Sequence, residues 1–249
     1  MTGEPRVALV TGAARGLGKA TARVLAADGV ALFLVDILAE RLEATAAELA
    51  AQGARVAHFA TDIATRANCR AAVDAAVAAY GRLDILCNVA AIVRFHRATD
   101  VTAEEWERIF AINASAPFWF CQAAIPHLLE TGGNIVNVAS QSAKLGTAYI
   151  VPYAATKGAL VQMTKSLAME YVDGPIRINV VSPGTMSTEI GEGVTMPEGL
   201  DMAKIQRYSG PRPANEAEEV AALIAFVASP RASAIHGAVL CADGGATTG

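Results

Sequence analysis

Short apolar runs alternate with helix-length segments along the whole chain, and this alternation limits the possible folds more than any other feature. Seven runs have the length and apolar content of buried strands, namely Arg6–Thr11, Ala31–Asp36, Arg55–Thr61, Leu83–Val89, Asn134–Ala139, Arg177–Ser182 and Val239–Ala242. Helical patterning is found between them, over Lys19–Ala27, Leu38–Gln52, Arg66–Tyr80, Ala103–Leu129 and Tyr153–Val172. This order predicts an α/β fold in which residues 1–249 form a single domain. We expect a doubly wound parallel sheet of about seven strands with helices on both faces.

A glycine-rich turn, Thr11–Gly18 (TGAARGLG), joins the first apolar run to the first helix. Gly12 permits a tight turn, Gly16 lets a ligand approach the backbone, and Gly18 lets the helix pack against the strand. Backbone N–H groups at the helix start, with Arg15 and Leu17 beside them, would then face an anion such as a pyrophosphate. The glycine spacing is GxxxGxG, not the commoner GxGxxG, so an ordinary glycine-rich turn remains the alternative.

The second strand ends in Asp36, eighteen residues after Gly18. An acid at this point can accept hydrogen bonds from the adenosine ribose and repels a 2′-phosphate, which favours NAD over NADP. Arg15 favours the opposite choice, since a basic residue in the turn can pair with a 2′-phosphate. We expect repulsion from Asp36 to outweigh one solvent-screened arginine.

Tyr153 and Lys157 lie four residues apart in a helical segment, thirteen residues after Ser140. This spacing puts the ammonium and the phenol on one helix face. A nearby cation lowers the pKa of a tyrosine, and a shift of roughly three units toward neutrality corresponds to about 4 kcal/mol. The pair therefore predicts a general acid/base, although Tyr-x-x-x-Lys alone is common by chance.

One set of motifs and residues consists of TGAARGLG, Asp36, Asn113, Ser140, Tyr153, Lys157 and the later PGTMST. The set resembles the classical short-chain dehydrogenase/reductase family, over about Arg6 to Gly245. The resemblance implies a Rossmann-like fold and a hydride-transferring enzyme. It implies that Ser140 positions the substrate oxygen, Tyr153 exchanges a proton with it, and Lys157 binds the nicotinamide ribose. Asn113 matches the family's fourth catalytic residue, which holds a water in a proton relay. The resemblance also implies a homotetramer in which the two longest helices pack between subunits.

Further cofactor contacts follow from the same resemblance. Asp62, with Ile63 after it, matches the acid that contacts the adenine ring, and the segment from Pro183 matches the one that binds the nicotinamide carboxamide. The residues expected there are Pro183, Gly184, Met186 and Thr188. The chain has Asn88-Val89-Ala90-Ala91 where the family has Asn-Asn-Ala-Gly. Asn88 and Ala90 are retained as expected contacts, but alanine disfavours positive φ, so a different backbone is expected at Ala91.

Three stretches are expected around the substrate, namely Ile92–Thr99, Gln141–Val151 and a lid over Ser187–Arg212. Predicted substrate contacts are Ser140, Gln141, Ser142, Tyr149 and Tyr153. A basic cluster, Arg94, His96 and Arg97, suits either a substrate anion or a solvated loop surface. None of these residues identifies a particular substrate.

Composition and charge exclude other classes of protein. A net charge of −4 predicts neither nucleic acid nor an anionic membrane as a partner, and no apolar run reaches the roughly 18 residues that span a bilayer. The first residues, MTGEPR, lack a signal peptide's apolar region, which favours a cytoplasmic protein. The four cysteines are widely spaced and form no CxxC pair, which predicts buried, reduced thiols at Cys69, Cys87, Cys121 and Cys241. The histidines show no ligand spacing, so no metal site is expected.

The sequence thus predicts an NAD-dependent oxidoreductase that interconverts a secondary alcohol and a ketone, a small-molecule substrate, with Tyr153 as general acid/base. An NADPH-dependent ketoreductase, such as a 3-oxoacyl-[acyl-carrier-protein] reductase, remains the alternative because of Arg15. A non-catalytic dinucleotide-binding sensor is a third possibility. Such a sensor needs the glycine turn but not Ser140, Tyr153 and Lys157, so their presence disfavours it.

Overall fold

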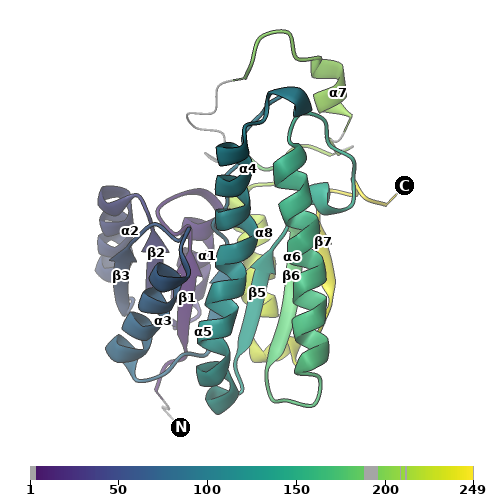
Figure 1. The fold of residues 1–249 in the computed structure, drawn as a ribbon. Coiled ribbons are helices and arrows are strands. Elements are labelled where there is room, and N and C mark those ends of the chain that lie inside the picture. The colour runs from purple at the N-terminus through teal and green to yellow at the C-terminus, as the bar shows by residue number, and fades with distance from the viewer. Residues whose placement is uncertain (1–3, 188–195, 208, 211, 249) are drawn as a thin grey trace.

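The computed structural model describes residues 4–187, 196–207, 209, 210 and 212–248. Within these residues, seven strands form one sheet in the order β3-β2-β1-β4-β5-β6-β7, and every neighbouring pair is parallel. The strands are β1 (Val7–Thr11), β2 (Ala31–Asp36), β3 (Val56–Ala60), β4 (Ile85–Asn88), β5 (Asn134–Val138), β6 (Arg177–Pro183) and β7 (Val239–Ala242). The predicted parallel sheet of about seven strands is confirmed (Figure 1).

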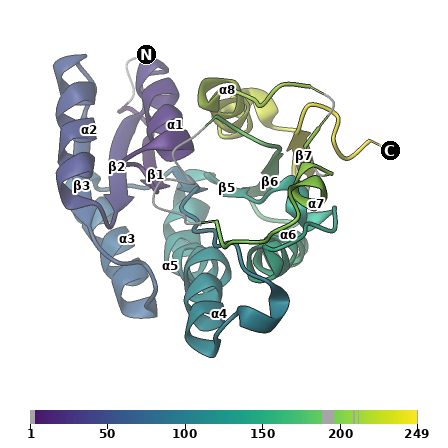
Figure 2. The ribbon, with the colours of Figure 1, turned by 90° about the horizontal axis from the view of Figure 1, so that it is seen from above.

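Helices cover both faces of the sheet, as a doubly wound fold requires (Figure 2). One face packs against α1 (Gly16–Ala27), α2 (Ala39–Ala51) and α8 (Ala217–Val227). The other packs against α3 (Arg66–Tyr80), α5 (Ala116–Thr131) and α6 (Val151–Glu170). Since the central strands are covered on both sides, they consist of near-continuous apolar residues, and all five residues of β1 are buried.

The helix expected over Ala103–Leu129 is present, but one turn within it is π-helical and not α-helical. The chain forms α4 (Ala103–Phe110), then a π-helical turn, Ala111–Ser115, and then α5. Pro117, near the start of α5, has no N–H to donate to the carbonyl of Asn113, four residues earlier. A π-turn widens a helix locally and is often found at functional sites. Here it contains Asn113.

In the connection between β6 and α8, the short helix α7 (Met202–Gln206) lies above the carboxyl ends of the strands, at the top of Figure 1. Part of the expected lid, residues 188–195, 208 and 211, lies outside the described residues. Three short 3₁₀ turns complete the secondary structure of the described part, over Ala98–Asp100, Gln141–Ala143 and Pro230–Ala232.

Candidate active site

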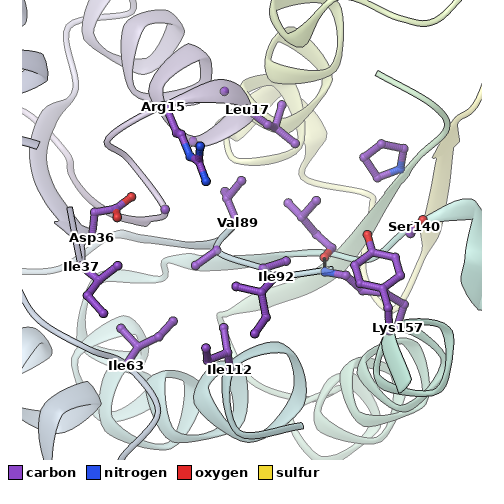
Figure 3. Close-up of a pocket in the computed structure, with 18 of the residues that line it drawn as sticks. Arg15, Leu17, Asp36, Ile37, Ile63, Val89, Ile92, Ile112, Ser140 and Lys157 are labelled. Carbon is purple, nitrogen blue, oxygen red and sulfur yellow. Dashed lines mark hydrogen bonds between the residues drawn. The ribbon is translucent and has the colours of Figure 1, made fainter. Parts of the chain in front are cut away.

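A cleft of about 250 Å³ opens at the carboxyl ends of the strands. Figure 3 shows Arg15 and Asp36 at one end of it and Ser140 and Lys157 at the other. The apolar side chains of Val89 and Ile92 lie between these ends (Figure 3). An elongated cleft with an apolar middle and polar groups at both ends fits a ligand with an aromatic base and a distant reactive group.

The glycine turn lies against the end of β4, and its geometry requires glycine. Gly12 has φ +71°, and an added Cβ would lie 2.9 Å from the Cα of Ala90. A Cβ on Gly18 would lie 2.0 Å from the carbonyl oxygen of Gly12. The close packing of the turn places the start of α1 at the cleft, where a pyrophosphate is expected. All five predicted turn residues line the cleft, namely Gly12, Arg15, Gly16, Leu17 and Gly18.

Thr11 fixes this turn to β4, which the sequence analysis missed. Its buried hydroxyl oxygen accepts hydrogen bonds from the backbone N–H groups of Val89, at 3.0 Å, and Ala90, at 3.1 Å. Both N–H groups lie just past the end of β4, where they would otherwise lack a strand partner. A threonine directly before a glycine turn was the signal available in the sequence.

Asp36 lines the opposite wall of the same end of the cleft. Its Oδ2 accepts a hydrogen bond from the backbone N–H of Ala14 at 3.0 Å, and its Oδ1 accepts one from Leu38 at 3.0 Å. These two bonds fix the carboxylate between the glycine turn and the start of α2. A carboxylate held in this way keeps further lone pairs at the cleft, where a ribose diol is expected.

Asp62 and Ile63 line the cleft beyond β3, where the adenine is expected. Arg108 of α4 also lines it, and Arg108 Nη1 lies 2.8 Å from Asp62 Oδ2. Burial works to raise the pKa of the Asp62 carboxyl, but the hydrogen bonds from Arg108 and from the backbone N–H of Ala64 outweigh it and keep this pKa below its ordinary value. The ion pair therefore links α4 to the loop that follows β3.

Ser140 lies at the other end of the cleft, just after β5. It caps the 3₁₀ turn that follows, since its Oγ accepts a hydrogen bond from the N–H of Ser142 at 3.2 Å. Its hydroxyl also donates to the hydroxyl of Ser142 at 3.2 Å. The strand end and the turn together hold the hydroxyl at the cleft.

Tyr153 and Lys157 project from consecutive turns of α6 into the same end of the cleft. Lys157 Nζ lies 5.6 Å from the centre of the Tyr153 ring and donates a hydrogen bond to the carbonyl oxygen of Val138 at 2.7 Å. Burial lowers the pKa of the Lys157 amine from its ordinary 10.5 to about 7. The amine can therefore gain or lose a proton near neutral pH, in addition to its electrostatic effect on the phenol.

Asn113 binds the loop after β4 through both groups of its amide. Its Oδ1 accepts a hydrogen bond from the N–H of Ile92 at 2.9 Å, and its Nδ2 donates to the carbonyl of Ile92 at 2.8 Å. The π-turn points this buried side chain at the loop. Because Pro117 cannot donate to it, the backbone carbonyl of Asn113 lacks the usual helical partner.

Asn88 is not placed at the cleft, in contrast to its expected role as a cofactor contact. Its side chain is buried beneath the strand ends, where its Nδ2 donates to Asn137 Oδ1 at 2.8 Å. Val89, Ala90 and Ala91 line the cleft instead. Among the described residues, Ala91 is not one of those with positive φ, so alanine is accommodated there without left-handed strain.

Pro183, Gly184 and Met186 line the cleft after β6, as expected, while Thr188 lies outside the described residues. Asn215, which the sequence analysis missed, holds this segment in place. Its N–H donates to the carbonyl of Thr185 at 2.9 Å, and its own carbonyl accepts from Ser187 at 3.1 Å.

A single carbonyl oxygen at the end of β7 binds both the side chain of Asn215 and the segment after β6. The carbonyl of Ala242 accepts from Asn215 Nδ2 at 2.7 Å and from the N–H of Gly184 at 2.9 Å. An added Cβ on Gly184 would lie 2.7 Å from the Cα of Asp243, so the segment also contacts the residue after the strand. The end of β7 thereby holds Pro183–Met186, the segment predicted to bind the nicotinamide, in place.

The predicted substrate contacts differ in their positions. Ser140 and Tyr153 line the cleft, whereas Gln141 and Ser142 are buried in the 3₁₀ turn behind it. Tyr149 is half-buried, and its phenolic oxygen accepts a hydrogen bond from the N–H of Asp201 at 3.2 Å.

The basic cluster is engaged in contacts within the protein. His96 Nε2 lies 2.9 Å from Glu105 Oε1, and Arg97 Nη2 donates to the carbonyl of Gly199 at 2.8 Å. Arg94 Nη1 donates to the carbonyl of Val93 at 2.9 Å. These contacts favour a structural role for the cluster over a substrate-anion site.

Three cysteines are buried as predicted, but Cys241 is exposed, and that part of the prediction is wrong. Cys241 lies in β7 at the edge of the sheet, where Lys144 Nζ lies 3.0 Å from its sulfur. In the described part of the chain, no group of three or more His, Cys, Asp or Glu side chains has the geometry of a metal site. None of the helices described there has the length and apolar content needed to cross a membrane.

A glycine turn at one end of a cleft, with a serine, a tyrosine and a lysine at the other, on a doubly wound sheet, defines a nicotinamide-dependent oxidoreductase. A family model described as enoyl-(acyl carrier protein) reductase matches residues 12–247. A D-threitol dehydrogenase from Mycolicibacterium smegmatis is 41% identical over 249 residues, which are 97% of this chain and 93% of the relative. The chain belongs to the short-chain dehydrogenase/reductase family and is an NAD(P)-dependent enzyme that acts on CH–OH groups.

Two solved structures show how widely this architecture is shared. A short-chain dehydrogenase from Burkholderia cenocepacia J2315, in complex with NADP, is 37% identical with a TM-score of 0.88 over 97% of both chains. A short-chain dehydrogenase from Mycobacterium paratuberculosis, bound to NAD, is 26% identical with a TM-score of 0.90 over 98% of both chains. The two neighbours hold different cofactors, so the shared fold does not determine which dinucleotide this chain prefers.

Proposed function

We propose that the protein is an NAD-preferring dehydrogenase that interconverts a secondary alcohol and a ketone. The observation that supports this most is the position of Ser140, Tyr153 and Lys157 at one end of a cleft whose other end has Asp36 beside the glycine turn. Bound NAD would supply the acceptor for the hydride. The side chains would supply the proton transfer and the orientation of the alcohol.

Tyr153 is proposed as the general base in oxidation and the general acid in reduction. As a phenolate it accepts the hydroxyl proton of the alcohol, and Ser140 holds the same oxygen through its hydroxyl. Lys157 favours the phenolate by its charge, and its pKa of about 7 also allows it to pass a proton onward. Asn113 holds the Ile92 loop through its side chain, which leaves its backbone carbonyl as the group proposed to bind the relay water.

Asp36→Asn is expected to reduce the preference for NAD. The neutral amide no longer repels a 2′-phosphate, and it loses a charge-assisted bond to the ribose diol, an effect of about 10- to 100-fold on the ratio of kcat/KM for NAD and NADP. Steady-state kinetics with one alcohol and both cofactors would measure this ratio. Asp28→Asn is the matched control, because it removes the same charge from an exposed position at the end of α1.

An NADPH-dependent ketoreductase is the second candidate, and the position of Arg15 at the cleft supports it. A wild-type preference for NADPH on one ketone would favour that candidate and contradict the argument from Asp36. The test of the reaction itself is an NAD-coupled screen over polyols such as D-threitol, cyclic alcohols, hydroxysteroids and hydroxyacyl thioesters. Tight NAD binding without turnover on any of these would instead support a sensor.

We also propose a homotetramer located in the cytoplasm. Exposed apolar side chains on or just after α6, namely Val151, Met169 and Val172, support contact between subunits. All four cysteines are free, which fits a reducing compartment. Light scattering is expected to give four times the chain mass of 25.7 kDa, and a monomeric mass would contradict this assembly.

A further inference from the structure

Tyr149 has a backbone conformation that an aromatic residue rarely adopts. Its φ is +68°, and it is the one non-glycine residue with positive φ in the described part of the chain. A bulky side chain in this region is strained, and such strain persists only where the surrounding contacts enforce it. The contacts of Tyr149 therefore indicate what the conformation achieves.

These contacts join three segments that are distant in the sequence. The carbonyl of Tyr149 accepts a hydrogen bond from the N–H of His96 at 2.9 Å. Its phenolic oxygen accepts one from the N–H of Asp201 at 3.2 Å. Tyr149 itself belongs to the segment between Ser140 and Tyr153, so one residue connects all three stretches that are expected to surround the substrate.

Asp201 is the residue that starts α7, the short helix at the top of Figure 1. Its carboxylate accepts a hydrogen bond from the N–H of Ala203 at 3.0 Å, so the phenol binds at the start of the helix. Two residues earlier, the carbonyl of Gly199 accepts from Arg97 at 2.8 Å. His96, which binds the Tyr149 carbonyl, also contacts Glu105 of α4. The segment around α7 is therefore bound by Tyr149 and by Arg97, and the residue next to Arg97 contacts α4.

We propose that Tyr149 is a positioning residue that holds α7 against the substrate side of the active site and thereby sets how closely a bound alcohol is enclosed. The left-handed backbone directs the carbonyl to His96 and the phenol to Asp201 together. This inference rests on the proposed dehydrogenase function. In this proposal Tyr149 acts only by holding α7 and transfers no proton.

Tyr149→Phe tests the proposal, because it retains the ring and removes only the oxygen that accepts from Asp201. Losing one such bond is expected to raise KM for the best alcohol by about 3- to 10-fold, with kcat and KM for NAD changed less than about two-fold. The amides of residues 201–206 are expected to exchange hydrogen several-fold faster, since the protected N–H of Asp201 loses its acceptor.

Tyr80→Phe is the matched control. The hydroxyl of Tyr80 donates to the carbonyl of Leu32 at 2.8 Å, far from α7, so its removal is expected to lower stability and leave both readouts unchanged. Unchanged exchange at residues 201–206 in Tyr149→Phe would overturn the proposal, and so would an equal rise in KM for NAD and for the alcohol. Hydrogen exchange does not need turnover, so it tests the role of Tyr149 even if the wild-type protein oxidises no alcohol.

Discussion

Tyr153→Phe is expected to lower kcat/KM for alcohol oxidation by about 10²- to 10⁴-fold, the range typical of a lost general acid/base. The ring is retained at the cleft, but no group of this side chain can then accept the hydroxyl proton. Binding of NAD is expected to change little, because the glycine turn, Asp36 and the segment after β6 remain in place. Turnover assays with NAD titration by fluorescence would separate the two effects.

Tyr171→Phe is a suitable control for this variant, since Tyr171 ends the same helix away from the cleft. It is expected to retain wild-type kinetics. Near wild-type turnover in Tyr153→Phe would reject the assignment of Tyr153 as the acid/base and require another proton acceptor in the cleft.

Lys157→Met is expected to lower activity by at least about 10²-fold and, at the same time, to stabilise the unliganded protein at acidic pH. Methionine has a similar length but lacks the charge that favours the phenolate and the N–H that binds Val138. The stabilisation follows from burial, since the fold encloses an amine whose charged form is disfavoured there.

The sign of the pH dependence follows from the lowered pKa of Lys157. Below a pH of about 7 the folded and unfolded chains both hold the proton, so the cost of the buried ammonium is present in full. Between about 7 and 10.5 the folded chain releases the proton first, and the free energy of unfolding rises with pH. The fall of this pKa from 10.5 to about 7 sets an upper limit of about 5 kcal/mol on the contribution.

The Tm of Lys157→Met is therefore expected to exceed that of the wild-type protein by roughly 5 °C at pH 6, and the difference is expected to shrink toward pH 10. Scanning calorimetry over this pH range would measure it. A variant such as Lys165→Met provides the control, because Lys165 is exposed on the same helix and should show no such trend. A pH-independent difference would contradict the view that Lys157 is buried as an amine with a depressed pKa.

The central strands were predictable from the sequence because they are buried on both faces. Each of the seven apolar runs matches a strand to within two residues at either end, since a parallel core strand needs a near-continuous apolar run. Ser140, Tyr153 and Lys157 could be placed together for a related reason. Two of them share one helix face, and the third follows a strand at the same edge of the sheet.

The parts that were not predictable depend on contacts between distant segments. Pro117 is a local signal for the irregular turn, but the pairing of the Asn113 side chain with Ile92 arises only once the loop after β4 lies beside it. Asn88 was expected at the cofactor because it matches the family's Asn-Asn-Ala-Gly segment, but its side chain lies in the core and donates to Asn137. Asn215 has no local signal, since its role arises only when β7 lies beside β6.

The shared carbonyl of Ala242 has a consequence for how the protein tolerates changes far from its reactive residues. The last strand completes the sheet and, through this carbonyl, also holds Asn215 and the Gly184 segment that lines the cleft. Truncations, fused tags or edge substitutions near the carboxyl terminus should therefore disturb coenzyme handling before they unfold the molecule.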